Sequence, residues 1–233
     1  MHPINILLSI SSLTVLAVTV ERFSFTTKVL LQPYDFIRLH EVFQILFLIS
    51  LTVLVPFFLL AEVTNKWEAM KTRKGLFWGG LFIFGVYLYG TGNGIHELAS
   101  FVFNTYCDTK NITGAICGGQ FFNDYYFGNG LYFIGGFLMN LALLIFEREN
   151  PNKTFTKNSR LLLIINSFIY ALAIFAYAAF DRVFVGFAYC VAMTVVIDAF
   201  LFLKRKNVWE YPVTVSLGVA YTLGTIASLP VRF

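Results

Sequence analysis

The sequence predicts an all-α, polytopic integral membrane bundle of about seven transmembrane helices, and three observations lead to that prediction. Charged residues make up 13% of the chain, about half of the ~25% typical of soluble domains. Hydrophobic residues make up 58%, and mean hydropathy is +0.71. The apolar residues also form continuous runs, several of which approach the ~20 residues that a helix needs to cross the hydrocarbon core.

Seven apolar runs organise the chain into a single transmembrane domain over residues 1–233. A membrane barrel would show alternating segments of about ten residues instead, and helices are the other way to satisfy every backbone amide in lipid. The expected spans are roughly 4–20, 42–63, 76–101, 125–146, 161–180, 183–203 and 211–229.

Basic residues predict the orientation of these spans. Eleven of the 17 Lys and Arg residues follow the second, fourth and sixth spans, and six lie on the opposite side. Because short cytoplasmic loops carry the basic excess, we expect a cytoplasmic N-terminus and a C-terminus that is outside or lumenal. The longest basic run, residues 204–206, is too short to suggest nucleic-acid binding, so the expected partner is the lipid bilayer.

The loop between the third and fourth spans carries two features of an outer loop. Cys107 and Cys117 lie ten residues apart and can form a disulfide in an oxidising compartment. Asn111-Ile112-Thr113 is a glycosylation acceptor in a eukaryotic host. A second acceptor sequence, at residues 152–154, falls on the cytoplasmic side and is expected to stay unmodified.

Glycines predict where helices approach closely. Gly75 and Gly79 form a GxxxG step, and so do Gly90 and Gly94. Small residues at this spacing let helix backbones meet in lipid. We therefore expect these positions to lie in helix–helix contacts.

Five ionisable residues are expected to gather near the outer ends of the second, third and fourth spans. The topology brings the start of the second and fourth spans and the end of the third to one face. A polar stripe on an apolar helix is expected to face the bundle or a wet cavity. The candidate pocket or metal residues are His40, Glu41, His96, Glu97 and Asp124.

Further polar residues lie along faces of the helices. The tripeptides at 92–94 and 128–130 both read Gly-Asn-Gly, so Asn93 and Asn129 are placed to bond across two helices. Asp198 is the acid that lies well inside a span, and an intramembrane carboxylate is a functional candidate by default. The polar helix-face candidates are Tyr89, Asn93, Asn129, Asn140, Asn166 and Asp198.

Three interpretations of the outer cluster stay open. The first is a Zn or Fe site, because imidazoles and carboxylates are suitable ligands, and it would make the chain a metal-dependent membrane hydrolase. Against it, Gln44 and Ser100 stand where an HExxH motif needs its second histidine. The second is a pocket for a small molecule or lipid, with transport as one use. The third is a structural role, including that of a subunit in a larger membrane complex.

Two other classes of function are excluded by missing residues. The last expected span contains no Lys to carry retinal, and no phosphate-binding Gly-rich loop of the GxxxxGK[ST] type is present. The working hypothesis is a multi-pass membrane protein with an outer polar pocket for a small molecule or lipid, acting as a binder or transporter.

Overall fold

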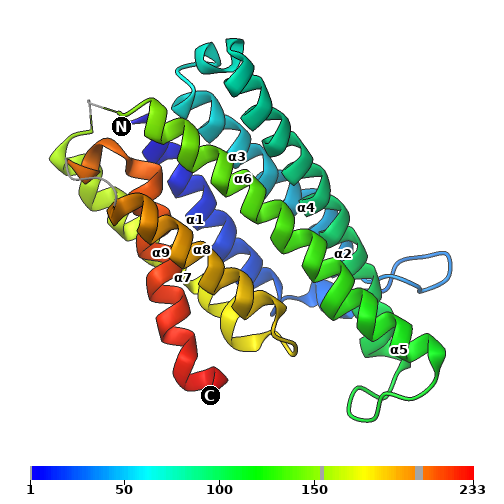
Figure 1. The fold of residues 1–233 in the computed structure, drawn as a ribbon. Coiled ribbons are helices and arrows are strands. Elements are labelled where there is room, and N and C mark those ends of the chain that lie inside the picture. Colours follow the sequence, from blue (N-terminus) through cyan, green and yellow to red (C-terminus); the bar gives the residue numbers. More distant parts are fainter. Residues whose placement is uncertain (1, 153–154, 203–206) are drawn as a thin grey trace.

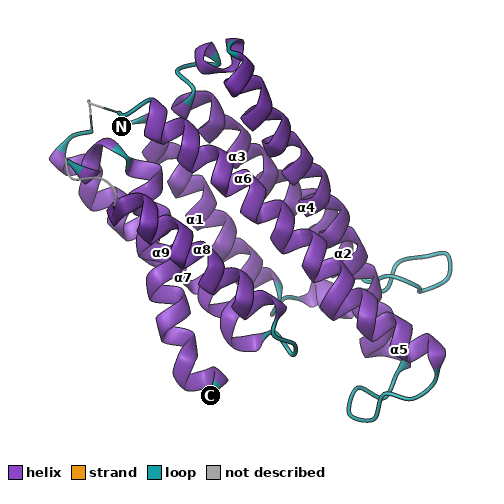
Figure 2. Cartoon of the chain, in the orientation of Figure 1, coloured by secondary structure: helices purple, strands orange, loops and turns teal. Residues whose placement is uncertain are grey.

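The computed structural model is a bundle of helices, and it describes residues 2–152, 155–202 and 207–233 (Figure 1). The side chains at positions 47 and 50 are outside this description. Among the described residues the regular structure is helical, apart from an isolated bridge between Leu30 and Arg38 (Figure 2). The N- and C-terminal ends lie at opposite ends of the bundle (Figure 1).

Seven helical segments in the described chain are long and apolar enough to cross a membrane, as predicted. The second combines α2 (Leu39–Val42), a π-helical segment η2 (Phe43–Leu48) and α3 (Ile49–Val63). The fourth combines α5 (Ala115–Phe122), a π-helical segment η4 (Asn123–Gly128) and α6 (Asn129–Glu149). The others are α1 (Pro3–Glu21), α4 (Arg73–Tyr106), α7 (Lys157–Phe180), α8 (Val185–Phe202) and α9 (Pro212–Arg232).

The third and fourth segments are longer than their apolar runs suggested. α4 ends at Tyr106 rather than near residue 101, and α5 begins the fourth segment ten residues before position 125. With 34 residues, α4 is about 50 Å long, which exceeds the ~30 Å of a hydrocarbon core. Hydropathy identifies only the apolar part of such a helix. The helical hydrogen bonds of the backbone continue into the polar residues beyond it, so the helix is longer than its apolar run.

The main helix pair, α4 and α6, meets through glycines at backbone distance. A Cβ atom added to Gly92 would lie 2.3 Å from the Tyr132 nitrogen, and one added to Gly135 would lie 2.4 Å from the Tyr89 nitrogen. Gly85 and Gly128 face the opposite backbone in the same way. We call these four residues the glycine seam, and they leave no room for a methyl group between the helices.

The predicted GxxxG steps are only partly used. Gly75 and Gly79 do contact neighbours, but these are Ala69 and Met70 in the turn before α4. Among the described residues, no atom lies within 4 Å of a Cβ added to Gly90 or Gly94, so the prediction that they make a helix contact is wrong. The helix is rotated so that Gly85 and Gly92, seven residues apart, form the contact instead.

A buried carboxylate ties α6 to α9 at the end of the bundle near the N-terminus. Glu147 is 1% exposed and accepts hydrogen bonds from the Val213 and Thr214 amides, each at 2.7 Å, and from the Thr214 hydroxyl. The first amides of a helix lack partners within the helix, and an acid there is favourable. Glu147 therefore serves as an N-terminal cap for α9 supplied by another helix.

Large apolar side chains remain exposed on the outward faces of several helices. Leu13 on α1, Ile83 on α4 and Val195 on α8 are each more than 60% exposed. A soluble monomer rarely exposes broad apolar surface. These faces therefore match an apolar surrounding.

The seam predicts a sharp difference between two neighbouring glycines. We expect Gly92→Ala to lower the free energy of unfolding by about 1–3 kcal/mol, because the methyl group overpacks the contact. Gly94→Ala is the matched control and should leave stability unchanged or slightly higher. Thermal unfolding of both variants in detergent measures the difference, and equal stabilities would contradict the seam.

Candidate functional site

The first part of the site joins the end of α1 to the start of the second helical segment. His40 Nδ1 lies 2.8 Å from Glu21 Oε2. The Gln44 side-chain amide donates to the same oxygen at 2.8 Å, and the Thr26 hydroxyl donates to the other carboxylate oxygen. Glu21 is thus held by three side chains and fixes the orientation of the His40 ring.

The second part joins α4 to η4 and pairs His96 with Asp124. His96 Nδ1 lies 2.7 Å from Asp124 Oδ1. It has hydrogen-bond geometry only with the main-chain oxygen of Asp124, at 3.3 Å. Asp124 is fully buried, and neither carboxylate oxygen has a hydrogen-bond donor among the described residues. The His96 ring is therefore the polar side chain found against this carboxylate among the described residues.

Glu97 lies between the two pairs. It is 7% exposed and within electrostatic range of both His96 and His40. In the part of the chain that the structure describes, no hydrogen bond reaches its carboxylate. One helical turn before Glu97 on α4, Asn93 is also buried, and its Nδ2 has no hydrogen-bond partner among the described residues. Glu97 and Asn93 thus present an acceptor and a donor to the same region.

Four of the five cluster candidates thus form the two imidazole–carboxylate pairs, one of them completed by Glu21, and the Glu97 carboxylate between the pairs. We call His40, His96, Glu97 and Asp124, with Glu21, the outer polar layer, after the face that the sequence predicts for them. Glu41, the fifth candidate, forms an ion pair with Arg38 and influences Glu97 only through its charge. Glu21 was missed in the sequence analysis because it directly follows the first apolar run, where an acid usually marks a span end.

The predicted Zn or Fe site is not formed by these residues. Among the described residues no group of three or more His, Cys, Asp and Glu side chains is placed to hold a metal ion. The geometry gives the reason. His40 is turned toward Glu21, His96 is turned toward Asp124, and the two carboxylates lie on different helices.

The predicted disulfide between Cys107 and Cys117 is present and closes the loop beside the layer. Arg182 reaches this loop and donates to the Thr109 carbonyl at 2.9 Å, while its guanidinium lies over the ring of Tyr125. Asp181 next to it accepts from the Gly186 amide. Burial raises the pKa of the Asp181 carboxyl, outweighing the lowering effect of its hydrogen bonds and of nearby Arg232.

Deeper in the bundle, tyrosine hydroxyls form a chain across three helices. Tyr89 on α4 and Tyr132 on α6 have their hydroxyls 2.8 Å apart, and Tyr132 and Tyr177 on α7 have theirs 2.6 Å apart. Asn140 donates at 3.2 Å to Tyr221 on α9, which also bonds Tyr189 on α8. Tyr89 and Asn140 thus serve as links between helices.

The other polar helix-face candidates do not form one inner group. Asn166 donates to Ser9 at 3.0 Å and ties α7 to α1. Asp198 is exposed on α8 and accepts from Thr222 at 3.4 Å. The expected bond between Asn93 and Asn129 is absent among the described contacts, because Asn93 Nδ2 is unpartnered and Asn129 is only half-buried.

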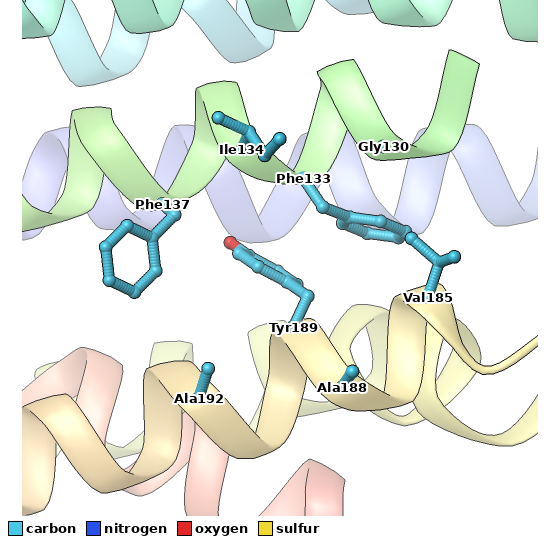
Figure 3. Close-up of a pocket in the computed structure, with 8 residues that line it drawn as sticks. All are labelled: Gly130, Phe133, Ile134, Phe137, Val185, Ala188, Tyr189 and Ala192. Carbon is cyan, nitrogen blue, oxygen red and sulfur yellow. The ribbon is translucent and has the colours of Figure 1, made fainter. Parts of the chain in front are cut away.

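A groove of about 290 Å³ lies between α6 and α8, and none of the residues that line it belongs to the outer polar layer. Phe133, Ile134 and Phe137 form its α6 wall, and Tyr189 projects from α8 with its hydroxyl turned toward α6 (Figure 3). On α8 the groove is lined by the small side chains of Ala188 and Ala192. The groove is apolar apart from this hydroxyl, so it does not share the chemistry of the layer.

No protein-family model, curated protein or solved structure matches this chain.

The hydroxyl chain predicts that Tyr132 stabilises the bundle through its oxygen. We expect Tyr132→Phe to lower the free energy of unfolding by about 1–2 kcal/mol, because two buried hydroxyls lose their shared partner. Tyr87→Phe is the matched control, since Tyr87 lies on α4 but is 66% exposed. Unfolding curves of the two variants in detergent decide the matter, and an unchanged Tyr132→Phe would refute the assignment.

Proposed function

We propose that this chain is a seven-span membrane protein whose outer polar layer binds a small molecule or a lipid head group. The seven long apolar helices and their exposed apolar faces support the membrane location. The observation that carries the binding proposal is Glu97, a buried carboxylate without a hydrogen-bond donor in the described chain, next to the unpartnered amide of Asn93.

Unpartnered buried polar groups need an explanation. More than about 90% of buried polar groups in proteins have a hydrogen-bond partner, and burying one without a partner costs about 1–3 kcal/mol. Here Asn93 Nδ2 and both Asp124 carboxylate oxygens are buried without a hydrogen-bond partner among the described residues, around a single turn of α4 and its neighbour η4, although Asp124 Oδ1 lies 2.7 Å from His96 Nδ1. Glu97, which is 7% exposed, adds a carboxylate that accepts no hydrogen bond in the described chain. A bound polar group supplies the missing partners.

The donor and acceptor inventory defines the chemistry of that group. Two carboxylates offer acceptors, and one amide offers a donor. A ligand rich in donors, such as one with an amine, fits this set, and its positive charge would offset the acidic excess. An apolar chain attached to the amine would extend into the surrounding helices, as expected for a lipid or amphiphile.

The alternatives differ in how much support they have. A metal-dependent hydrolase lacks a metal-binding group in the described residues. Transport adds movement of the ligand to binding, and the same layer would be its outer site.

Membership of a larger membrane complex is favoured by one observation, the exposed Asp198 on a candidate span, because an intramembrane acid usually pairs with a partner. A native gel of Asp198→Leu against wild type would reveal a lost assembly.

The binding proposal predicts a specific response to amphiphilic amines. We expect dodecylamine to raise the unfolding temperature of the purified protein, and dodecanoate to leave it unchanged, because only the amine complements Glu97. Glu97→Gln should abolish the response. Glu68→Gln is the control, since Glu68 is an exposed acid paired with Lys71 outside the layer. A wild-type response in Glu97→Gln would refute the proposal.

We further propose that the N-terminus is cytoplasmic and the C-terminus outside or lumenal. The basic loops and an odd number of spans support this orientation.

Tags at the two ends test the orientation. In intact cells, an antibody should reach a C-terminal tag, whereas an N-terminal tag should become reactive only after permeabilisation. The measurement is immunofluorescence with and without detergent, and two tags in one compartment would contradict an odd number of crossings.

A further inference from the structure

The loop that joins α4 to α5 combines a closed disulfide with an exposed acceptor sequence for glycosylation. Cys107 and Cys117 form the disulfide, and Asn111 and Thr113 lie inside the ring that it closes. Both Asn111 and Thr113 are exposed. The two features are independent, because one depends on sulfur oxidation and the other on a three-residue motif.

The Asn111 side chain is free to react. The main-chain amides of Lys110 and Asn111 both donate to the Asp108 carboxylate, at 2.9 and 3.3 Å, which turns the chain at this point. No hydrogen bond of the Asn111 side-chain amide is found among the described residues. These hydrogen bonds hold the main chain of the turn and do not involve the side-chain amide of Asn111, which belongs to an exposed residue.

The disulfide indicates the compartment of the loop. Disulfides form and persist in oxidising compartments and are rare in the cytosol. In a eukaryotic cell the oxidising lumen is also where Asn-x-Ser/Thr sequences receive glycans. An oxidised loop with an exposed Asn111 therefore meets both conditions at once.

The chain contains its own control at the other end of the bundle. Asn152 begins the second acceptor sequence, whose residues 153 and 154 lie outside the described residues. Asn152 is half-buried, and its main-chain amide donates to the Glu210 carbonyl at 2.7 Å. Asn152 Nδ2 lies 3.0 Å from His2 Nε2, so Asn152 lies beside the N-terminal end of the chain. That end and α5, which follows the disulfide loop, lie at opposite ends of the bundle (Figure 1).

We infer that Asn111 carries an N-linked glycan when the chain is made in a eukaryotic cell, and that Asn152 does not. The inference rests on the proposed orientation but not on the proposed ligand. In the reaction, Asn111 Nδ2 loses a proton and forms a bond to the anomeric carbon of a sugar. The bond from that carbon to the pyrophosphate of a lipid-linked oligosaccharide breaks, and the pyrophosphate leaves with the electron pair.

Electrophoretic mobility of the full chain, expressed in eukaryotic cells, tests the inference. Digestion with peptide N-glycosidase should shift the wild-type band downward by one glycan. Asn111→Gln and Thr113→Ala should migrate at the digested position without treatment. Thr113→Ser keeps the acceptor motif and should retain the glycan, whereas Asn152→Gln should behave as wild type.

Each contrary outcome contradicts either the proposed glycosylation, the proposed orientation or both. A wild-type band that digestion leaves unchanged, with the C-terminal tag outside, overturns the modification and leaves the orientation standing. A glycan that is lost in Asn152→Gln and kept in Asn111→Gln overturns the inference and the orientation together. A glycan that survives Thr113→Ala shows that the motif is not the acceptor. The dodecylamine response of Glu97 is measured separately and is not affected by these results.

Discussion

The backbone contact between α4 and α6 is the constraint on which the rest of the arrangement depends. Side chains adapt to a neighbour by changing rotamer, but two backbones in contact through Gly92 and Gly135 have one register. That register sets Tyr89 beside Tyr132 and His96 beside Asp124, because each pair lies one or two turns from a seam glycine. In lipid, where packing replaces the hydrophobic drive, such contacts carry much of the association energy.

The outer polar layer follows from this register and from the length of α1. Glu21, the last residue of α1, fixes the Nδ1 side of His40, while Asp124 faces the Nδ1 side of His96. The hydrogen bond at one ring nitrogen determines the role of the other. Both rings therefore keep Nε2 for other partners, and Glu97 interacts electrostatically with both. The two imidazole–carboxylate pairs are thus linked to each other electrostatically through Glu97, while hydrogen bonds act within each pair.

The sequence predicted the elements well and their rotation poorly. Apolar runs reveal helices of membrane length because hydrocarbon thickness sets a minimum, and the paired cysteines were found for a similarly local reason. Periodicity within one helix does not say which face meets which neighbour. Gly90 and Gly94 therefore looked as suitable for a contact as Gly85 and Gly92, yet no atom of the described chain lies within 4 Å of a Cβ added to either of them. Glu21 was missed because its partner His40 lies across a loop that no spacing rule connects.

The two π-helical segments explain why the layer could not be derived from ideal helix spacing. η2 follows His40 and Glu41, and η4 contains Asp124. A π turn holds one extra residue, and each residue of an α-helix turns the chain by about 100°. The residues before such a turn are therefore rotated relative to the apolar stripe after it. In a regular α-helix without the extra residue, burying the apolar side chains of the segment against the bundle would rotate Asp124 or His40 away from the interior. Because π turns often occur at functional sites, their position beside both imidazole–carboxylate pairs is an independent reason to place the function in this layer.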